Sequence, residues 1–155
     1  MEFNIQEYSD LDYDAFKEML FTCINIDYKM QRTMEQVERW QRELIQQAAE
    51  RIVFLDILKI ENTARGFIIY QIDSPRSDWC EKEGYGNIRE LYVAEDFRKS
   101  GCGRVLVTHA EKQLNQKSVP GIYLTTDEAM DFWTKMGYSD SGEICLKNDC
   151  RIFVK

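Results

Sequence analysis

The sequence predicts an α/β (α+β) fold in which residues 1–155 form a single domain. Three observations lead to this class. Several apolar or alternating runs have the length of a strand, and other segments carry apolar residues at helical spacing behind capping residues. No apolar run approaches the roughly 20 residues that a membrane-spanning helix needs. The predicted element order is β-α-α-β-β-β-α-β-α-β-β.

The N-terminal half begins with a segment that alternates apolar and polar residues, and two helical patterns follow it. Ser9 and Asp10 offer an N-cap to the first helix, and Thr33 with Gln36 forms a capping box for the second. Turn residues at 61–63 separate two apolar runs, which predicts a hairpin. The expected elements are a strand at 3–8, a helix to about Phe21, a loop around 24–31, a helix from Thr33, and strands at 51–59 and 66–72.

The C-terminal half begins with a long polar segment, residues 73–86, whose proline and glycines predict a surface loop. Asp127 offers an N-cap to the last helix, and Gly137 ends it. The expected elements are a strand at 87–93, a helix at 101–115, a strand at 121–125, a helix at 128–136, and closing strands at 138–147 and 150–154.

The charge of the chain restricts its partners. The formal net charge is −7, which argues against nucleic acid because phosphate binding needs a basic surface. The same charge is compatible with a cationic substrate, and equally with a role in solubility alone. The N-terminus shows no basic segment followed by an apolar one, so we expect a cytoplasmic protein without a membrane partner.

The cysteines predict neither a metal site nor a disulfide framework. There are five, an odd number, none in a CxxC pair, and the chain has one histidine, His109. We therefore expect free thiols in a reducing compartment. The cysteines are Cys23, Cys80, Cys102, Cys145 and Cys150.

The run Arg98-Lys99-Ser100-Gly101-Cys102-Gly103 predicts an anion site. It joins the strand-like run at 88–93 to a helical pattern that begins at Arg104. Backbone N–H groups at a helix start are unpaired, and the helix dipole adds positive character there. The glycines let the backbone approach a bulky anion, and the basic side chains add charged donors. A diphosphate group fits this pattern, which by itself is open to many nucleotides.

The chain resembles the GNAT superfamily of acyl-CoA-dependent N-acyltransferases. The run from Arg98 to Gly103 matches the family's cofactor signature R/Q-x-x-G-x-G/A, and Glu90-Leu91-Tyr92-Val93 is similar to its usual fourth strand. A second pattern, A-x-x-F-Y-x-K-x-G-F/Y, stands as Ala129-Met130-Asp131-Phe132-Trp133-Thr134-Lys135-Met136-Gly137-Tyr138. The resemblance is sharp from Asn87 to Tyr138, whereas residues 1–50 match only in the order of elements.

This resemblance implies a central mixed, mostly antiparallel sheet of six or seven strands, flanked by about four helices, with splayed fourth and fifth strands. It implies acetyl-CoA or a related acyl-CoA as co-substrate, and no metal. The backbone amides from Lys99 to Arg104 would hold the pyrophosphate, and the main chain of Leu91 and Val93 the pantetheine arm. The implied cofactor-binding residues are Leu91, Tyr92, Val93, Arg98, Lys99, Ser100, Gly101, Cys102, Gly103, Arg104, Thr126, Phe132 and Trp133.

Glu90 is the candidate general base. An acceptor amine with a lysine-like pKa of about 10.4 is protonated near pH 7, and its proton must leave before attack. The resemblance supports this role, since similar members often carry a carboxylate on the fourth strand. The alternative is an ion-paired or solvated strand residue. The backbone N–H near Val93 is the implied oxyanion donor.

The general acid is the main departure from the family pattern. Many members use a tyrosine at the position of Trp133, whose indole N–H is not a practical proton source. Either Tyr85, Tyr92, Tyr123 or Tyr138 supplies the proton, or solvent does. Phe132 and Trp133 pack either against the cofactor or in the core. Thr126 stands where many members have an asparagine.

Two further residues have plainer interpretations. Cys102 has no base partner in the pattern, so a packing or loop role is expected rather than nucleophilic catalysis. His109 lies off the apolar face of its helix, which predicts a surface histidine.

The leading hypothesis is an N-acetyltransferase that transfers an acetyl group directly, in a ternary complex, to a primary amine of a small molecule or peptide. An acyl-CoA-binding sensor with little catalysis and a nucleotide-binding protein of another fold are the alternatives. The acceptor is expected to be small and cationic, its identity is open, and family members often dimerise, which leaves a homodimer open.

Overall fold

A computed structural model describes residues 2–155, which form a seven-stranded mixed sheet in the order β1-β2-β3-β4-β5-β7-β6. The strands are β1 (Phe3–Glu7), β2 (Phe54–Ile60), β3 (Thr63–Ile72), β4 (Gly86–Val93), β5 (Ile122–Thr126), β6 (Ser139–Ile144) and β7 (Arg151–Val154). The helices are α1 (Tyr13–Thr22), α2 (Met34–Ala49), α3 (Cys102–Gln116) and α4 (Met130–Lys135). The predicted sheet and its flanking helices are therefore confirmed.

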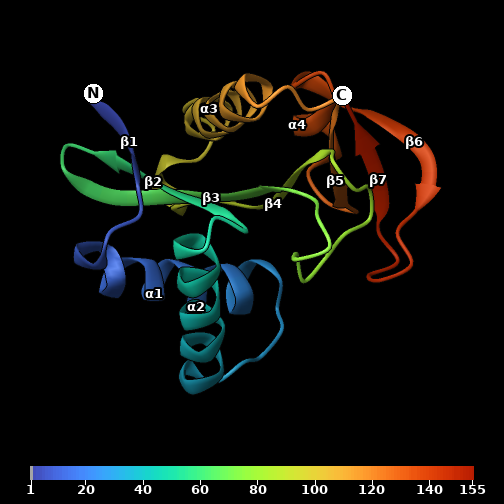
Figure 1. The fold of residues 1–155 in the computed structure, drawn as a ribbon. Coiled ribbons are helices and arrows are strands. Elements are labelled where there is room, and N and C mark those ends of the chain that lie inside the picture. The colour runs from blue at the N-terminus through green and yellow to red at the C-terminus, as the bar shows by residue number, and fades with distance from the viewer. Residues whose placement is uncertain (1) are drawn as a thin grey trace.

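Helices cover both faces of the sheet, α1 and α2 on one side and α3 and α4 on the other (Figure 1). Successive side chains of β3 point to opposite faces of the sheet, so this strand contributes to the hydrophobic core on each face. Phe67 and Ile69 pack among side chains of α1 and α2, whereas Ile68 and Tyr70 pack among those of α3 and α4. Burial on both faces explains why β3 reads as a continuous apolar run rather than an alternating one.

The sheet is antiparallel except between β4 and β5. These two strands pair at Gly86–Ile122 and Asn87–Tyr123 only, and then separate. β4 remains paired with β3 up to Val93, and β5 remains paired with β7. The predicted splay of the fourth and fifth strands is thus present, and one edge of β4 lies open along most of its length.

The segment expected as a loop at 24–31 begins instead as a continuation of α1. Cys23–Asp27 forms a π-helical turn, and the N–H of Tyr28 donates to the Cys23 carbonyl at 3.0 Å. The sequence pattern missed this turn because π-turns have no spacing signal of their own. Burial of Cys23 and Ile24 among the side chains of α1 and α2 holds it in place.

The predicted capping box of α2 is confirmed: the Gln36 N–H donates to Thr33 Oγ1 at 3.2 Å, and the Thr33 N–H donates to Gln36 Oε1 at 2.9 Å. The predicted β2–β3 hairpin is confirmed as well, with Glu61 and Asn62 at positive φ in its turn. Asn tolerates this conformation better than most residues, because its short side chain bonds locally.

The loop before β4 is anchored by a buried carboxylate. Asp73 is 1% exposed and accepts from Gln71 Nε2 at 2.7 Å and from the N–H groups of Glu81 and Lys82 at 3.0 Å each. The Tyr123 hydroxyl of β5 donates to the same carboxylate. Asp73 therefore fixes the loop at the point where β4 and β5 are paired.

His109 differs from its prediction as a surface residue. It is half-buried on α3, and its Nε2 lies 2.9 Å from Asp56 Oδ2 on β2, an oxygen that also accepts from the Tyr70 hydroxyl at 2.7 Å. A helical pattern places a residue relative to its own helix, and it contains no information about a carboxylate on a strand beneath it.

Within residues 2–155 no helix is both long enough and apolar enough to cross a membrane.

Candidate active site

A β-bulge shapes β4 where it faces the splay. Ile69 of β3 pairs with Glu90, but Tyr70 pairs with Ile88, so Arg89 is an extra residue on β4. Such an insertion bends a strand and changes the direction of the neighbouring side chains. The bulge directly precedes Glu90, whose side chain contributes to the wall of the cavity described below.

The open edge of β4 presents main-chain groups of Leu91 and Val93. The Ala94 N–H donates to the Arg65 carbonyl at 2.7 Å, toward β3. Since successive peptide groups of a strand point to opposite sides, those of Val93 and Leu91 point away from β3, into the splay. The Val93 carbonyl accepts from Arg98 Nε at 2.7 Å, which leaves its N–H available.

The loop after β4 gathers unpaired backbone donors. None of the residues 2–155 accepts a backbone hydrogen bond from the N–H groups of residues 99–104, and the first bond of α3 runs from the Val105 N–H to the Gly101 carbonyl at 3.0 Å. Lys99 and Gly101 have φ of 62° and 91°. Alternation of left-handed with right-handed residues turns successive N–H groups inward and forms an anion-binding nest.

The two glycines of the loop serve different needs. Gly101 has positive φ, and a Cβ built there meets nothing within 4 Å, so the space beside it is open for a ligand. A Cβ on Gly103 would lie 3.2 Å from the Phe132 ring. Gly103 therefore permits the close packing of α3 against α4, whereas Gly101 permits the turn itself.

A cavity of about 900 Å³ lies along the splay and reaches the start of the loop. Its walls come from the π-turn region, the loop before β4, β4 and its following loop, β5, the β5–α4 turn, α4 and the β6–β7 turn. The lining residues are Asp27, Tyr28, Met30, Trp79, Asn87, Ile88, Arg89, Glu90, Leu91, Arg98, Leu124, Thr125, Thr126, Asp127, Glu128, Ala129, Phe132, Trp133, Asn148 and Cys150. One space therefore adjoins both the candidate base and the start of the anion loop.

Among residues 2–155, Glu90 has one side-chain donor, the Tyr28 hydroxyl, at 2.6 Å from its Oε2. Burial raises the pKa of the Glu90 carboxyl, while the Tyr28 hydrogen bond and the charge of Arg89 lower it by less. Burial, together with the Glu90 charge, raises the pKa of Tyr28 well above its ordinary value. The Tyr28 hydroxyl therefore keeps its proton, and the Glu90 carboxyl binds a proton more tightly than an ordinary glutamate does.

Arg98 does not project freely from the loop. Its guanidinium donates to the Val93 carbonyl, as above, and its Nη2 donates to Asp27 Oδ2 at 2.9 Å. The guanidinium also lies over the Tyr92 ring, 5.5 Å from the centroid. Lys99 and Arg104 are exposed as well, and within residues 2–155 they form no ion pair, so their charges are free to act on a ligand.

The four tyrosines considered as proton donors lie elsewhere. Tyr123 and Tyr138 are buried and donate to Asp73 and Glu111, Tyr92 stacks on Phe67 on the α1–α2 face, and Tyr85 is exposed. Of the tyrosines within residues 2–155, Tyr28 is the one that lines the cavity. Sequence reasoning missed it because it follows the π-turn and belongs to neither motif.

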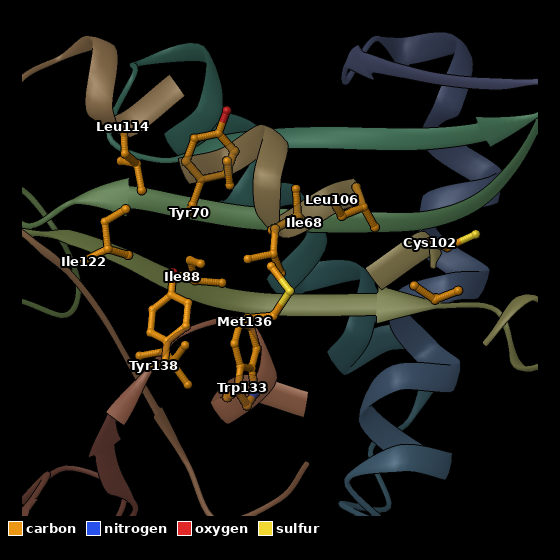
Figure 2. Packing of buried hydrophobic residues seen from close by; sticks show 14 of the residues in the cluster. Ile68, Tyr70, Ile88, Cys102, Leu106, Leu114, Ile122, Trp133, Met136 and Tyr138 are labelled. Carbon is orange, nitrogen blue, oxygen red and sulfur yellow. The ribbon is translucent and has the colours of Figure 1, made fainter. Parts of the chain in front are cut away.

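The remaining candidates divide between cavity and core. Trp133 is 7% exposed and packs edge-on against Phe132 and Tyr138, and Figure 2 shows it close to Met136. Trp133 and Phe132 thus belong to the core, and both also line the cavity, whereas their packing against the cofactor stays a prediction. The Cys102 thiol is buried in the same core, in agreement with a packing role. The Thr126 hydroxyl bonds to Glu128 of its own turn.

Solved structures share this fold at low identity. The PaiA N-acetyltransferase from Thermoplasma acidophilum, solved with coenzyme A, is 18% identical with a TM-score of 0.76, over 100% of this chain and 99% of that chain. An acetyltransferase from Streptococcus agalactiae is 22% identical with a TM-score of 0.72, over 99% of this chain and 97% of that chain. At these identities the likeness establishes the fold.

Sequence comparison identifies the family. An uncharacterized N-acetyltransferase of Chlorobaculum tepidum is 40% identical over 53 residues, and the aligned segment spans about a third (34%) of each chain. The model of the acetyltransferase (GNAT) family matches residues 14–138, which include the splay, the anion loop and α4. The chain therefore belongs to the acetyltransferase (GNAT) family of enzymes.

Proposed function

We propose that the protein moves an acetyl group from acetyl-CoA to the primary amine of a small molecule or peptide, by direct transfer in a ternary complex. The observation that carries this proposal is one cavity lined by Glu90, by Leu91 on the open edge of β4 and by Arg98 at the start of the anion loop. We further propose that residues 1–155 act as one acetyltransferase domain.

The donor side has the right chemistry for an acyl-CoA. The unpaired N–H groups of residues 99–104 at the start of α3 suit a pyrophosphate, and Lys99 and Arg104 add positive charge at its edge. The main-chain groups of Leu91 and Val93 suit an extended arm with amide groups, which pairs with β4 much as a strand does. Acetyl-CoA supplies the activated thioester, and the chain supplies the groups that bind and orient it.

Glu90 takes the proton from the acceptor ammonium, directly or through water. Its raised pKa brings the carboxyl closer to neutral pH, where a base is most effective. The N–H of Val93, free toward the splay, donates to the oxygen that gains charge during transfer. Neither group needs to move far, since both belong to β4.

The departing thiolate takes its proton from solvent. Tyr28 is a poor acid because its pKa is raised, whereas a thiol has an ordinary pKa of about 8.5. The indole of Trp133 donates hydrogen bonds without releasing a proton near neutral pH. A thiolate of this pKa can leave without a general acid, so the absence of the family tyrosine at Trp133 is compatible with turnover.

The acceptor is a small cationic amine. The carboxylates of Glu90, Asp127 and Glu128 line the cavity, and the whole chain carries a net charge of −7. The ring of Tyr28 adds a face that attracts an ammonium group. This lining favours an acceptor with an aliphatic or aromatic arm over a polyanion.

A panel of amines with acetyl-CoA, followed by release of free thiol, tests the proposal. Glu90→Gln should lower kcat on the best amine by about 100-fold or more, as expected for loss of a general base, and leave the Kd of acetyl-CoA unchanged. Thr125→Ser, a mild change elsewhere in the cavity lining, is the control and should stay near the parent rate. Equal rates for Glu90→Gln and the parent protein at every pH would remove Glu90 from the mechanism.

One observation favours a second candidate, an acyl-CoA-binding sensor with little catalysis. Trp133 occupies the position at which many family members carry their acid. Calorimetry separates the two functions: tight binding of acetyl-CoA, with no thiol release on any amine of the panel, would favour the sensor.

A further inference from the structure

Two side chains that follow one another on the chain reach two different parts of the candidate site. Asp27 ends the π-helical turn and accepts from Arg98 of the anion loop at 2.9 Å. Tyr28 comes next and donates to Glu90 at 2.6 Å. The hydrogen bond of a π-turn spans one more residue than that of an α-helix, and such turns are frequent at functional sites. Cys23–Asp27 thus brings the end of α1 against both the base and the donor loop.

We propose that Tyr28 is a positioning residue for Glu90, whose hydrogen bond orients the carboxyl group and favours its ionised form. This role rests on the proposed function, in which Glu90 is the base. The hydrogen bond uses one lone pair of Oε2, whereas Oε1 accepts from no side chain of residues 2–155 and is the more open oxygen for the acceptor's proton. The ion pair between Asp27 and Arg98 holds in place the segment that carries Tyr28 to Glu90.

Other charges around Glu90 do not replace this contact. Arg89 turns its Nη1 to Gln71 Oε1 at 3.2 Å, and Arg98 is engaged by Asp27 and Val93. Cys23 lies beside Tyr28, and burial raises the pKa of its thiol, which keeps it neutral. Tyr28 and Arg89 act directly on Glu90, and the nearby Cys23 is affected by Glu90, Asp27 and Arg98. Asp127 and Glu128 line the same cavity.

The sign of the effect follows from the direction of the hydrogen bond. A hydroxyl that donates to a carboxylate stabilises its charged form and lowers its pKa. Removal of the hydroxyl therefore raises the Glu90 pKa further. A hydrogen bond to a charged group is stronger than one between neutral groups, so its loss should move the Glu90 midpoint measurably. Because the base acts when deprotonated, the acid limb of the rate profile moves to higher pH.

Tyr28→Phe tests this with two readouts. The first is kcat/KM against pH on the best amine of the panel. The second is the titration of the Glu90 carboxyl by ¹³C NMR in protein labelled at glutamate side chains, assigned with Glu90→Gln. Both midpoints should rise by about one unit or more, and the rate on the alkaline plateau should stay within a few-fold of the parent protein.

The matched control is Tyr13→Phe. Tyr13 also donates to a carboxylate, Glu38 Oε2 at 3.4 Å, but lies outside the cavity on α1. Tyr13→Phe should leave both midpoints unchanged.

In the unaltered protein, the Tyr28 ring carbon that bears the hydroxyl should titrate at the Glu90 midpoint. That step should vanish in Glu90→Gln, a test that does not depend on the folding of Tyr28→Phe.

An unchanged Glu90 midpoint in Tyr28→Phe, or a Tyr28 carbon that ignores the titration of Glu90, overturns the positioning role. So does a loss of rate that is equal at all pH values with no change in the NMR titration. The NMR readouts need no turnover, so a protein that acetylates none of the amines contradicts the proposed function separately.

Discussion

The two ends of β4 differ in how many hydrogen-bond donors surround a nearby carboxylate. At the end where β4 pairs with β5, Asp73 accepts from the Gln71 side chain, from two backbone N–H groups and from Tyr123. At the splayed end, Glu90 has one side-chain donor and lines a cavity. A carboxylate with several fixed donors holds a fold together, whereas one with few donors keeps proton affinity for chemistry.

The same contrast applies to the backbone at each end. Gly86 and Asn87 pair with β5, and the Gly86 N–H donates to the Gly121 carbonyl at 3.0 Å. Leu91 and Val93 turn their peptide groups into the splay, and the loop beyond them keeps unpaired N–H groups. The end of β4 that pairs with β5 therefore determines where the site lies. The splayed end provides the backbone groups that can bind a ligand.

Asp73→Ala should have the largest effect, and it should be on stability. It leaves the Gln71 amide, two backbone N–H groups and the Tyr123 hydroxyl without their acceptor, in surroundings that are largely closed to water. Each buried unpaired group costs about 1–3 kcal/mol, so a loss of about 4 kcal/mol is expected in urea unfolding. Asp78→Ala, an exposed residue of the same loop, is the control. A loss below 1 kcal/mol for Asp73→Ala would refute the anchoring role.

Glu90→Gln should affect stability in the opposite direction. Burial raises the folded pKa of Glu90, so the stability that its protonated form contributes is complete below the unfolded pKa of about 4.3 and is lost as pH rises through the folded pKa. The glutamine variant escapes this loss and should be as stable as the parent protein or slightly more so at pH 7, within about 1 kcal/mol. Urea titrations between pH 4 and pH 8 measure it. Destabilisation that grows with pH would contradict this assignment.

Gly101→Ala should act mainly on binding of the donor. The new Cβ has room, but φ of 91° is strained for alanine, by about 1 kcal/mol. Relaxation of the loop would misalign its N–H groups and weaken acetyl-CoA binding by roughly fivefold, measured by calorimetry. Gly84→Ala, at positive φ in the loop before β4, is a comparison without a role in binding. An equal loss of acetyl-CoA affinity in Gly101→Ala and Gly84→Ala would contradict the assignment of donor binding to the loop at Gly101.

Local signals in the sequence predicted the elements that depend on neighbours along the chain. The capping box at Thr33, the β2–β3 hairpin and the strand–loop–helix at Arg98 to Gly103 all depend on residues a few positions apart. The second motif located α4, although the helix is shorter, at Met130–Lys135, than the predicted 128–136.

The contacts that sequence reasoning missed join residues far apart. Tyr28 and Glu90 are separated by 62 positions, Asp56 and His109 by 53, and Asp73 and Tyr123 by 50. No spacing rule links such pairs, because they meet only when strands and helices pack. The bulge at Arg89 is equally invisible, since it depends on the register between two strands.

The open edge of β4 also links the lifetime of the protein to its supply of donor. An unpaired strand edge next to a cavity is a weak point at which local opening begins and proteases gain access. A ligand that pairs with that edge is bound by the folded chain alone, and at 100 times its Kd it adds about 2.7 kcal/mol to the free energy of unfolding. When acyl-CoA is abundant, turnover of the protein by proteolysis should therefore slow, so the abundance of the enzyme would follow the availability of its donor substrate.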